Sequence, residues 1–210
     1  MVDNFDYIAR LIDGFNKEVS AKHDLKDVYY HLQVIKRSKD THEGANSVLI
    51  KAYQIDLDHP LERYKDDIIE LCERFKARAY INPSPKSKEA TAVQMLTELS
   101  DCFRKHDFNY LKRLWNSAAG KVGAIDKHWV IDCDYSENFG DRDIATLAKF
   151  IDRECEPFDK VKYISCIPTR SGKHLITHPF NVARFAEVYP DIAVHKNNPT
   201  VLYVPESLGK

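Results

Sequence analysis

The second half of the chain alternates strand-like and helix-like segments in an order that strongly restricts its fold. Its helical segments have apolar residues at intervals of three and four, and its strand-like segments are short apolar runs. In chain order they are a strand at 128–132, a helix at 143–154, strands at 161–167 and 173–177, a helix at 179–189 and a strand at 200–204. This βαββαβ order is that of the ferredoxin-like supersecondary unit, so we expect an α/β fold of the α+β type.

The first half predicts another α/β unit. Its expected segments are a helix at 4–18, strands at 28–35 and 47–55 around the charged loop 36–46, a helix at 60–77, a strand at 78–82 and helical structure over 87–116. The small-residue stretch 117–124 fits neither pattern and predicts a connecting loop. We therefore expect an N-terminal unit over residues 1–120 and the βαββαβ unit over 121–210, together forming one compact domain.

The composition is that of an ordinary globular protein, with 43% hydrophobic and 30% charged residues. The five cysteines are scattered singly, which excludes a disulfide framework and a thiolate zinc site. The sequence has no long apolar run and no secretory leader, so we expect a cytoplasmic protein without a membrane partner. A net charge of −1 argues against a general nucleic-acid coat protein but allows a local basic groove.

Two carboxylates end the strand-like run HWVIDCD. Asp132 and Asp134 are two residues apart, so on a strand both side chains point to the same face, about 6.5 to 7 Å apart along the chain. Such oxygen donors suit Mg²⁺ or Mn²⁺, whose remaining positions are filled by water and phosphate. The alternative is that one or both simply cap the following loop.

The charges around this pair are distributed unevenly. Residues 160–186 contain no acid but five Lys or Arg, whereas residues 126–159 contain ten acids and four Lys or Arg. An acidic strand that holds metal beside a basic one that holds phosphate is typical of polyphosphate chemistry. In the alternative interpretation, the two segments only balance each other in a surface network.

The basic stretch includes the turn Arg170-Ser171-Gly172-Lys173, followed by His174 at the start of a strand. Arg170 and Lys173 can reach phosphate oxygens, the Ser171 hydroxyl can donate a hydrogen bond, and an imidazole can bind or protonate phosphate. Gly172 would let the backbone approach a ligand. An ordinary packed or surface histidine is the alternative for His174.

The aspartate pair and the SGKH turn together resemble the archaeo-eukaryotic primase and primase-polymerase superfamily, over roughly residues 129–204. The resemblance implies an RRM-like unit joined to an N-terminal α/β unit. It further implies Asp132, Asp134 and His174 as catalytic residues, with the aspartates holding Mg²⁺ or Mn²⁺. Ser171 and His174 would contact a nucleoside triphosphate, and DNA or RNA would be the second partner. Divergent members occur in phages, which would place the protein in the host cytoplasm.

In that superfamily a third acid on a later strand completes the metal site. Asp191 is the only aspartate between His174 and the C-terminus, and Glu206 follows the last predicted strand after a proline. If neither reaches the site, the chain would be a catalytically inactive protein that binds nucleic acid or a nucleotide. A metal-dependent phosphodiesterase that uses the same carboxylates on water is a further alternative.

A second basic region surrounds a predicted strand in the first half. Arg78 and Tyr80 alternate on that strand, and Lys86 and Lys88 follow it, so we expect these four residues to contact nucleic acid. A half-exposed strand with an ordinary polar face is the alternative.

A second aspartate pair, Asp56-Leu57-Asp58, precedes Pro60 and a helical pattern. We expect Asp58 to cap that helix, and not to bind metal. The sequence predicts no oligomeric state.

Overall fold

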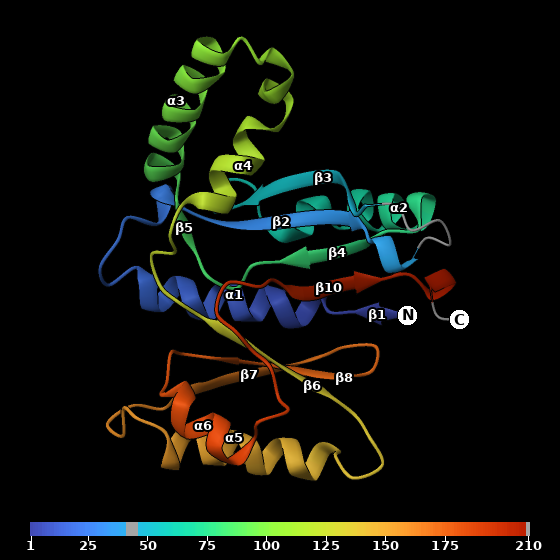
Figure 1. The fold of residues 1–210 in the computed structure, drawn as a ribbon, viewed down its shortest axis with the longest axis vertical. Helices are drawn as coiled ribbons and strands as arrows, with labels where there is room; N and C mark the ends of the chain where they lie inside the picture. Colours follow the sequence, from blue (N-terminus) through green and yellow to red (C-terminus); the bar gives the residue numbers. More distant parts are fainter. Residues whose placement is uncertain (41–45, 209–210) are drawn as a thin grey trace.

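Two antiparallel sheets form the framework of the protein, and the computed structural model describes residues 1–40 and 46–208 of it (Figure 1). The first sheet has the strand order β1-β10-β4-β2-β3, and β5 pairs with β2 outside this path. Its strands are β1 (Val2–Asp3), β2 (Val28–Lys36), β3 (Val48–Ile55), β4 (Arg78–Ile81), β5 (Lys86–Ser87) and β10 (Thr200–Val204). The two long strands β2 and β3 pair antiparallel with each other. Residues 41–45 of the loop between them lie outside the described residues.

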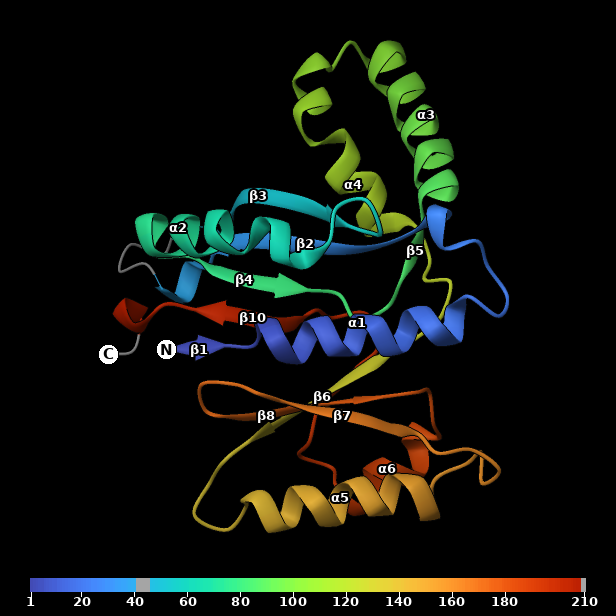
Figure 2. The same ribbon diagram turned by 180° about the vertical axis from the view of Figure 1, so that it is seen from behind.

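The second sheet has the strand order β7-β8-β6-β9. Its strands are β6 (Trp129–Asp134), β7 (Tyr163–Pro168), β8 (Gly172–Thr177) and β9 (Val194–His195), and its helices are α5 (Asp141–Glu154) and α6 (Val182–Val188). Both helices cover the face that points away from the first sheet (Figure 2). The element order β6-α5-β7-β8-α6-β9 is βαββαβ, and the α+β class is confirmed.

The last strand of this unit was predicted wrongly. The predicted strand 200–204 is β10, which lies between β1 and β4 in the first sheet, whereas the short β9 completes the second sheet beside β6. All five residues of β10 are buried, so the strand needs cover on both faces and neighbours on both edges. The C-terminal segment of residues 121–210 therefore returns to the first sheet.

The helix α1 (Phe5–Val19) lies between the two sheets (Figure 1). Its apolar stripe consists of Phe5, Ile8, Leu11, Phe15 and Val19, at the spacing of one helix face. Most of these side chains share one core cluster with the first sheet, the helix α2 (Lys65–Phe75) and second-sheet residues such as Val130 and Ile176. A continuous apolar core thus joins both sheets.

A helical arm projects from the first sheet (Figure 1). It contains α3 (Lys88–Lys105), the 3₁₀ segment η4 (Phe108–Arg113) and α4 (Leu114–Lys121). The loop predicted over 117–124 is wrong in its first part, because α4 continues to Lys121. Alanine is the strongest helix former, which favours this continuation. Ala118 and Ala119 are completely buried, and their small side chains allow the helix to pack closely.

Short 3₁₀ segments connect several of these elements: η1 (Leu25–Asp27), η2 (Ser38–Asp40), η3 (Leu61–Tyr64) and η5 (Glu206–Leu208). The predicted helix 60–77 thus corresponds to η3 followed by α2. Within the described residues, no helix combines the length and apolar character that a membrane span requires.

Candidate metal and nucleotide site

Strands β6 and β8 place the predicted catalytic residues on one face of the second sheet. Their register pairs Asp132 with His174 and Asp134 with Gly172. Val130 and Ile176 point into the core between the sheets, and side chains two apart on a strand share a face. Asp132, Asp134 and His174 therefore face the first sheet.

His174 connects the two sheets through its ring nitrogens. Its Nε2 lies 3.4 Å from Asp132 Oδ1, and its Nδ1 lies 2.9 Å from the hydroxyl oxygen of Thr200. Thr200 is the first residue of β10 and is fully buried. This contact could not be predicted from local sequence patterns, because Thr200 comes from a strand of the other sheet.

The SGKH turn is closely joined to Asp134. The Ser171 hydroxyl donates a 2.6 Å hydrogen bond to Asp134 Oδ1. A Cβ atom on Gly172 would lie 2.0 Å from the Cys133 carbonyl oxygen and 2.8 Å from the Asp134 Cα. Gly172 thus allows β6 to approach β8 closely. This strand contact is sufficient to explain the glycine, without the ligand predicted beside it from the sequence.

A groove of about 560 Å³ opens at the end of β6. It is lined by four aspartates, Asp132, Asp134, Asp143 and Asp191, and its described lining contains no Lys or Arg. Asp143 was not predicted; its carboxylate accepts a hydrogen bond from the Gly140 N–H at the start of α5. Such an anionic groove attracts cations and repels a free triphosphate.

The predicted third acid does not complete a compact ligand set in this structure. Asp191 lines the same groove, but it is exposed. Next to Asp132, just before β9, lies Ala193, whose backbone carbonyl accepts a hydrogen bond from the Asp132 N–H. Glu206 lies in η5, outside the groove lining. Among the described residues, no three of these acids bring their oxygens within 4.8 Å of one another. Asp132 and Asp134 are the two that share a face with His174.

The predicted phosphate-binding cations diverge from this face. Lys173 alternates with His174 and points to the opposite side, where its Nζ lies 2.8 Å from Asp141 Oδ1. The hydrogen bond to Asp141 raises the pKa of Lys173. Arg170 donates a 2.5 Å hydrogen bond from Nη1 to the Leu208 carbonyl. Of the four residues predicted to hold phosphate, only Ser171 and His174 lie next to the aspartate pair.

A third cation of the acid-free stretch is structural. Lys162 is completely buried, and its Nζ donates to the carbonyls of Asp152, Cys155 and Pro157 at 2.7, 2.9 and 2.7 Å. These carbonyls lie at or just after the C-terminal end of α5, where a positive charge is favourable. The charge asymmetry of the sequence is therefore partly explained by packing.

The four predicted nucleic-acid residues do not form one exposed surface. Arg78 is buried and makes a bidentate pair with Asp40, at 2.7 and 2.5 Å. Lys86 is also buried and donates to the Val122 carbonyl at 2.6 Å, and burial lowers its pKa. Tyr80 is half-buried and accepts a 3.1 Å hydrogen bond from Arg37.

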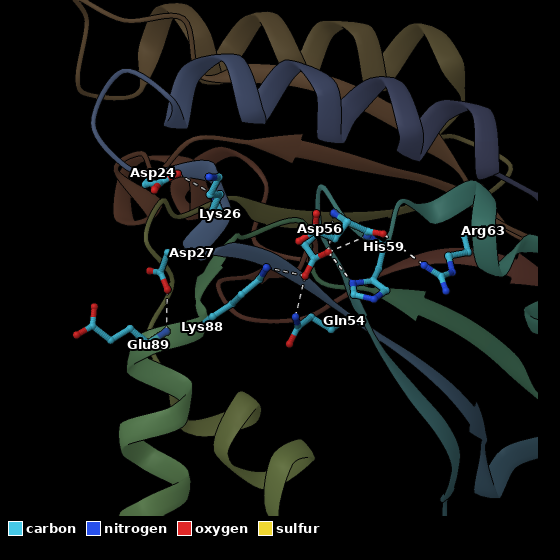
Figure 3. A network of polar contacts seen from close by, with 10 residues as sticks. Asp24, Lys26, Asp27, Gln54, Asp56, His59, Arg63, Lys88 and Glu89 are labelled. Carbon is cyan, nitrogen blue, oxygen red and sulfur yellow. Dashed lines mark hydrogen bonds and ion pairs between the residues drawn. The ribbon is translucent and has the colours of Figure 1, made fainter.

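The fourth, Lys88, belongs to a polar network around the buried Asp56 (Figure 3). Its Nζ lies 2.7 Å from Asp56 Oδ2, which also accepts a 2.7 Å hydrogen bond from Gln54. Asp56 Oδ1 accepts from the backbone N–H groups of Asp58 and His59 at 3.1 and 2.9 Å. The second aspartate pair is thus structural, but Asp56 and not Asp58 fixes the turn.

No family model, curated protein or solved structure matches this chain. Asp132, Asp134, Ser171 and His174 are consequently the main basis for assigning a function. Two carboxylates with water and phosphate completing the shell are sufficient to hold Mg²⁺ or Mn²⁺.

Proposed function

We propose that the protein is a primase-polymerase-like nucleotidyltransferase that binds a nucleoside triphosphate, Mg²⁺ or Mn²⁺, and DNA or RNA. The observation that carries this proposal is the placement of Asp132 and Asp134 on one face of β6, with His174 directly opposite Asp132. The βαββαβ order of the second sheet, with β6 and β8 in its centre, supports it.

In the proposed reaction, the 3′-oxygen of one nucleotide forms a bond to the α-phosphorus of the next, the bond from that phosphorus to pyrophosphate breaks, and the hydroxyl proton passes to water. Asp132 and Asp134 would hold the metal, which offsets the charge that develops on the transferred group. His174 would donate a hydrogen bond to a phosphate oxygen, and its contact with Thr200 fixes the orientation of its ring. The protein would thus contribute mainly positioning and charge neutralisation.

Metal binding would precede nucleotide binding at this site. The groove next to Asp132 and Asp134 does not include His174, but its described lining has four aspartates and no Lys or Arg, so its charge would repel a triphosphate near this pair until a cation has bound.

We expect the reaction to occur in the cytoplasm. The five cysteines are free in this structure, and they would remain reduced in that compartment.

A second candidate is a protein that binds nucleotide or nucleic acid without catalysis. One observation favours it: no third acid of the described residues gathers with Asp132 and Asp134 within 4.8 Å, and the neighbouring backbone is that of Ala193. Two metals about 3.5 to 4 Å apart repel each other, and two carboxylates alone offset that repulsion poorly.

Primer extension distinguishes these candidates. The purified protein with Mn²⁺, four nucleotides and a primed DNA or RNA template should lengthen the primer, and Asp132→Asn should abolish this activity. Lys173→Ala is the matched control, because Lys173 is the next residue to His174 but faces α5. If wild-type protein binds Mn²⁺ and nucleotide but never extends a primer, the non-catalytic candidate replaces the transferase.

A further inference from the structure

A second group of potential metal ligands lies at the other end of the same sheet face. Glu18, His128 and His178 bring one ligand atom each to within 4.8 Å of one another, and Glu18 Oε2 lies 4.0 Å from His178 Nε2. Glu18 comes from α1, His128 immediately precedes β6, and His178 immediately follows β8. Three segments that are distant in sequence thus meet at one point.

His128 has a hydrogen-bonding pattern that leaves one ring nitrogen available. Its Nδ1 lies 3.0 Å from the Pro83 carbonyl oxygen, which can only accept, so Nδ1 carries the proton of the neutral ring. Its Nε2 then has a lone pair, yet this atom is buried and has no hydrogen-bond partner. A buried polar atom without a partner is unfavourable unless a ligand satisfies it.

The surroundings of His128 also resemble those of metal-binding histidines. Such residues commonly donate their second ring N–H to a backbone carbonyl, which fixes the tautomer. Phe15 stacks on the His128 ring with centroids 3.8 Å apart, which restricts its orientation. The register that pairs Trp129 with Thr177 places His178 beside His128, and the two rings are 5.3 Å apart.

We propose that Glu18, His128 and His178 form a Zn²⁺ site that joins α1 to the second sheet. Two imidazole nitrogens and one carboxylate are typical ligands of Zn²⁺ with an open fourth position. In tetrahedral geometry the ligand atoms would be roughly 3.3 Å apart. Glu18 is exposed, so a change of its side-chain rotamer can bring its carboxylate closer to the two imidazoles.

A cavity of about 590 Å³ lies beside these ligands, and Glu18, His178 and Asp126 help to line it. Asp126 Oδ2 lies 3.7 Å from His128 Nε2 and can supply a fourth ligand in place of water. These ligands include no cysteine, so cysteine spacing could not reveal this site.

This centre is separate from the proposed nucleotide site. His174 lies in β8 and His178 comes directly after its end, four residues further on, which corresponds to about 13 Å of extended chain. Metals that act together on one phosphate are about 3.5 to 4 Å apart. The proposed zinc site is therefore separate from the nucleotide site. Loss of Zn²⁺ binding there would not affect metal binding at Asp132.

Zn²⁺ titration of the full chain by calorimetry tests the proposal. Wild-type protein should bind one Zn²⁺ at this site, and the His178→Ala and Glu18→Gln variants should each weaken binding more than about 100-fold, since even indirect partners of a metal commonly contribute 10- to 100-fold. His23→Ala is the matched control, because His23 lines the same cavity but is not among the three ligands. Asp132→Asn should also bind Zn²⁺ normally.

Co²⁺ provides a second measurement that does not depend on activity or stability. Its visible absorption should indicate a four- or five-coordinate nitrogen and oxygen site in wild type, and this signal should disappear in His178→Ala. If His128→Gln does not fold, the variants of the exposed Glu18 and the half-buried His178 still test the zinc site. Zn²⁺ affinity that is unchanged in both His178→Ala and Glu18→Gln, or is lost only in Asp132→Asn, would overturn the proposal.

Discussion

Asp132 and His174 are opposed across strands β6 and β8, with Asp132 Oδ1 3.4 Å from His174 Nε2. The other ring nitrogen of His174 contacts Thr200 in the first sheet. A carboxylate of one strand is thus connected through an imidazole to the neighbouring sheet. A ligand bound at Asp132 would consequently contact a residue whose position depends on how the two sheets pack.

Replacement of His174 should weaken nucleotide binding. A charge-assisted hydrogen bond contributes about 1.5 to 3 kcal/mol, so His174→Ala should raise the Kd of a nucleoside triphosphate with Mn²⁺ by roughly 10- to 100-fold. Calorimetry measures this Kd directly. Lys173→Ala should leave it nearly unchanged, because Lys173 points toward Asp141 on the opposite face. If the Lys173 variant has the larger effect, phosphate binds on the α5 side.

Nucleotide binding should depend strictly on a divalent metal. The groove residues Asp132, Asp134, Asp143 and Asp191 would repel a triphosphate, so binding should fall below detection when EDTA removes the metal. The double variant Asp132→Asn, Asp134→Asn should lose Mn²⁺ binding at the groove. This measurement is best made in a His178→Ala background, so that the proposed zinc site does not contribute. Retained Mn²⁺ binding in that triple variant would argue against the carboxylate site.

Gly172 should not tolerate a side chain. Gly172→Ala would place Cβ 2.0 Å from the Cys133 carbonyl oxygen, so β6 and β8 must separate at Asp134. We expect the free energy of unfolding to fall by about 3 kcal/mol, measured by urea denaturation. Gly14→Ala is the control, because Gly14 lies within α1 with nothing within 4 Å of its added Cβ. That change should instead stabilise the protein by about 1 kcal/mol.

Asp56 should contribute stability that depends on pH. Burial by itself would raise its pKa, but hydrogen bonds from Lys88, Gln54 and His59 outweigh this effect and lower it to about 2. The stabilisation is therefore present above the unfolded-state pKa of about 4 and is lost as the pH falls through about 2.

Asp56→Asn should lower the free energy of unfolding by about 2 kcal/mol near neutral pH. Urea denaturation at several pH values should show this deficit shrinking between about pH 4 and 2, because wild-type Asp56 is then protonated. The neighbouring Asp58 is exposed, so Asp58→Asn should have little effect. A deficit that stays constant down to pH 2 would show that Asp56 acts through its shape and not its charge.

Local patterns in the sequence were sufficient for several elements of the second sheet. The 3.6-residue period of α5 and the short apolar runs of β6, β7 and β8 depend on side chains close in sequence. The shared face of Asp132 and Asp134 follows from the two-residue period of a strand. The closeness of His174 to this pair required only the expected pairing of two strands.

Charge patterns were less informative, because a cation's function depends on its partner. The basic stretch gave no means of distinguishing Lys162, which is buried at the end of α5, from the exposed Arg170. Arg78 and Lys86 were likewise predicted to contact nucleic acid, but Arg78 instead pairs with Asp40 and Lys86 donates to the Val122 carbonyl. These partners are 38 and 36 residues away in sequence.

The sequence by itself determined the α+β class, most helices and strands, and the shared face of Asp132 and Asp134. Only the tertiary structure decided that β10 returns to the first sheet, that Thr200 contacts His174, and that Glu18 meets His128 and His178. The physical reason is that helix and strand periods arise from neighbouring residues. Sheet membership and ligand geometry instead depend on which buried surfaces pack together.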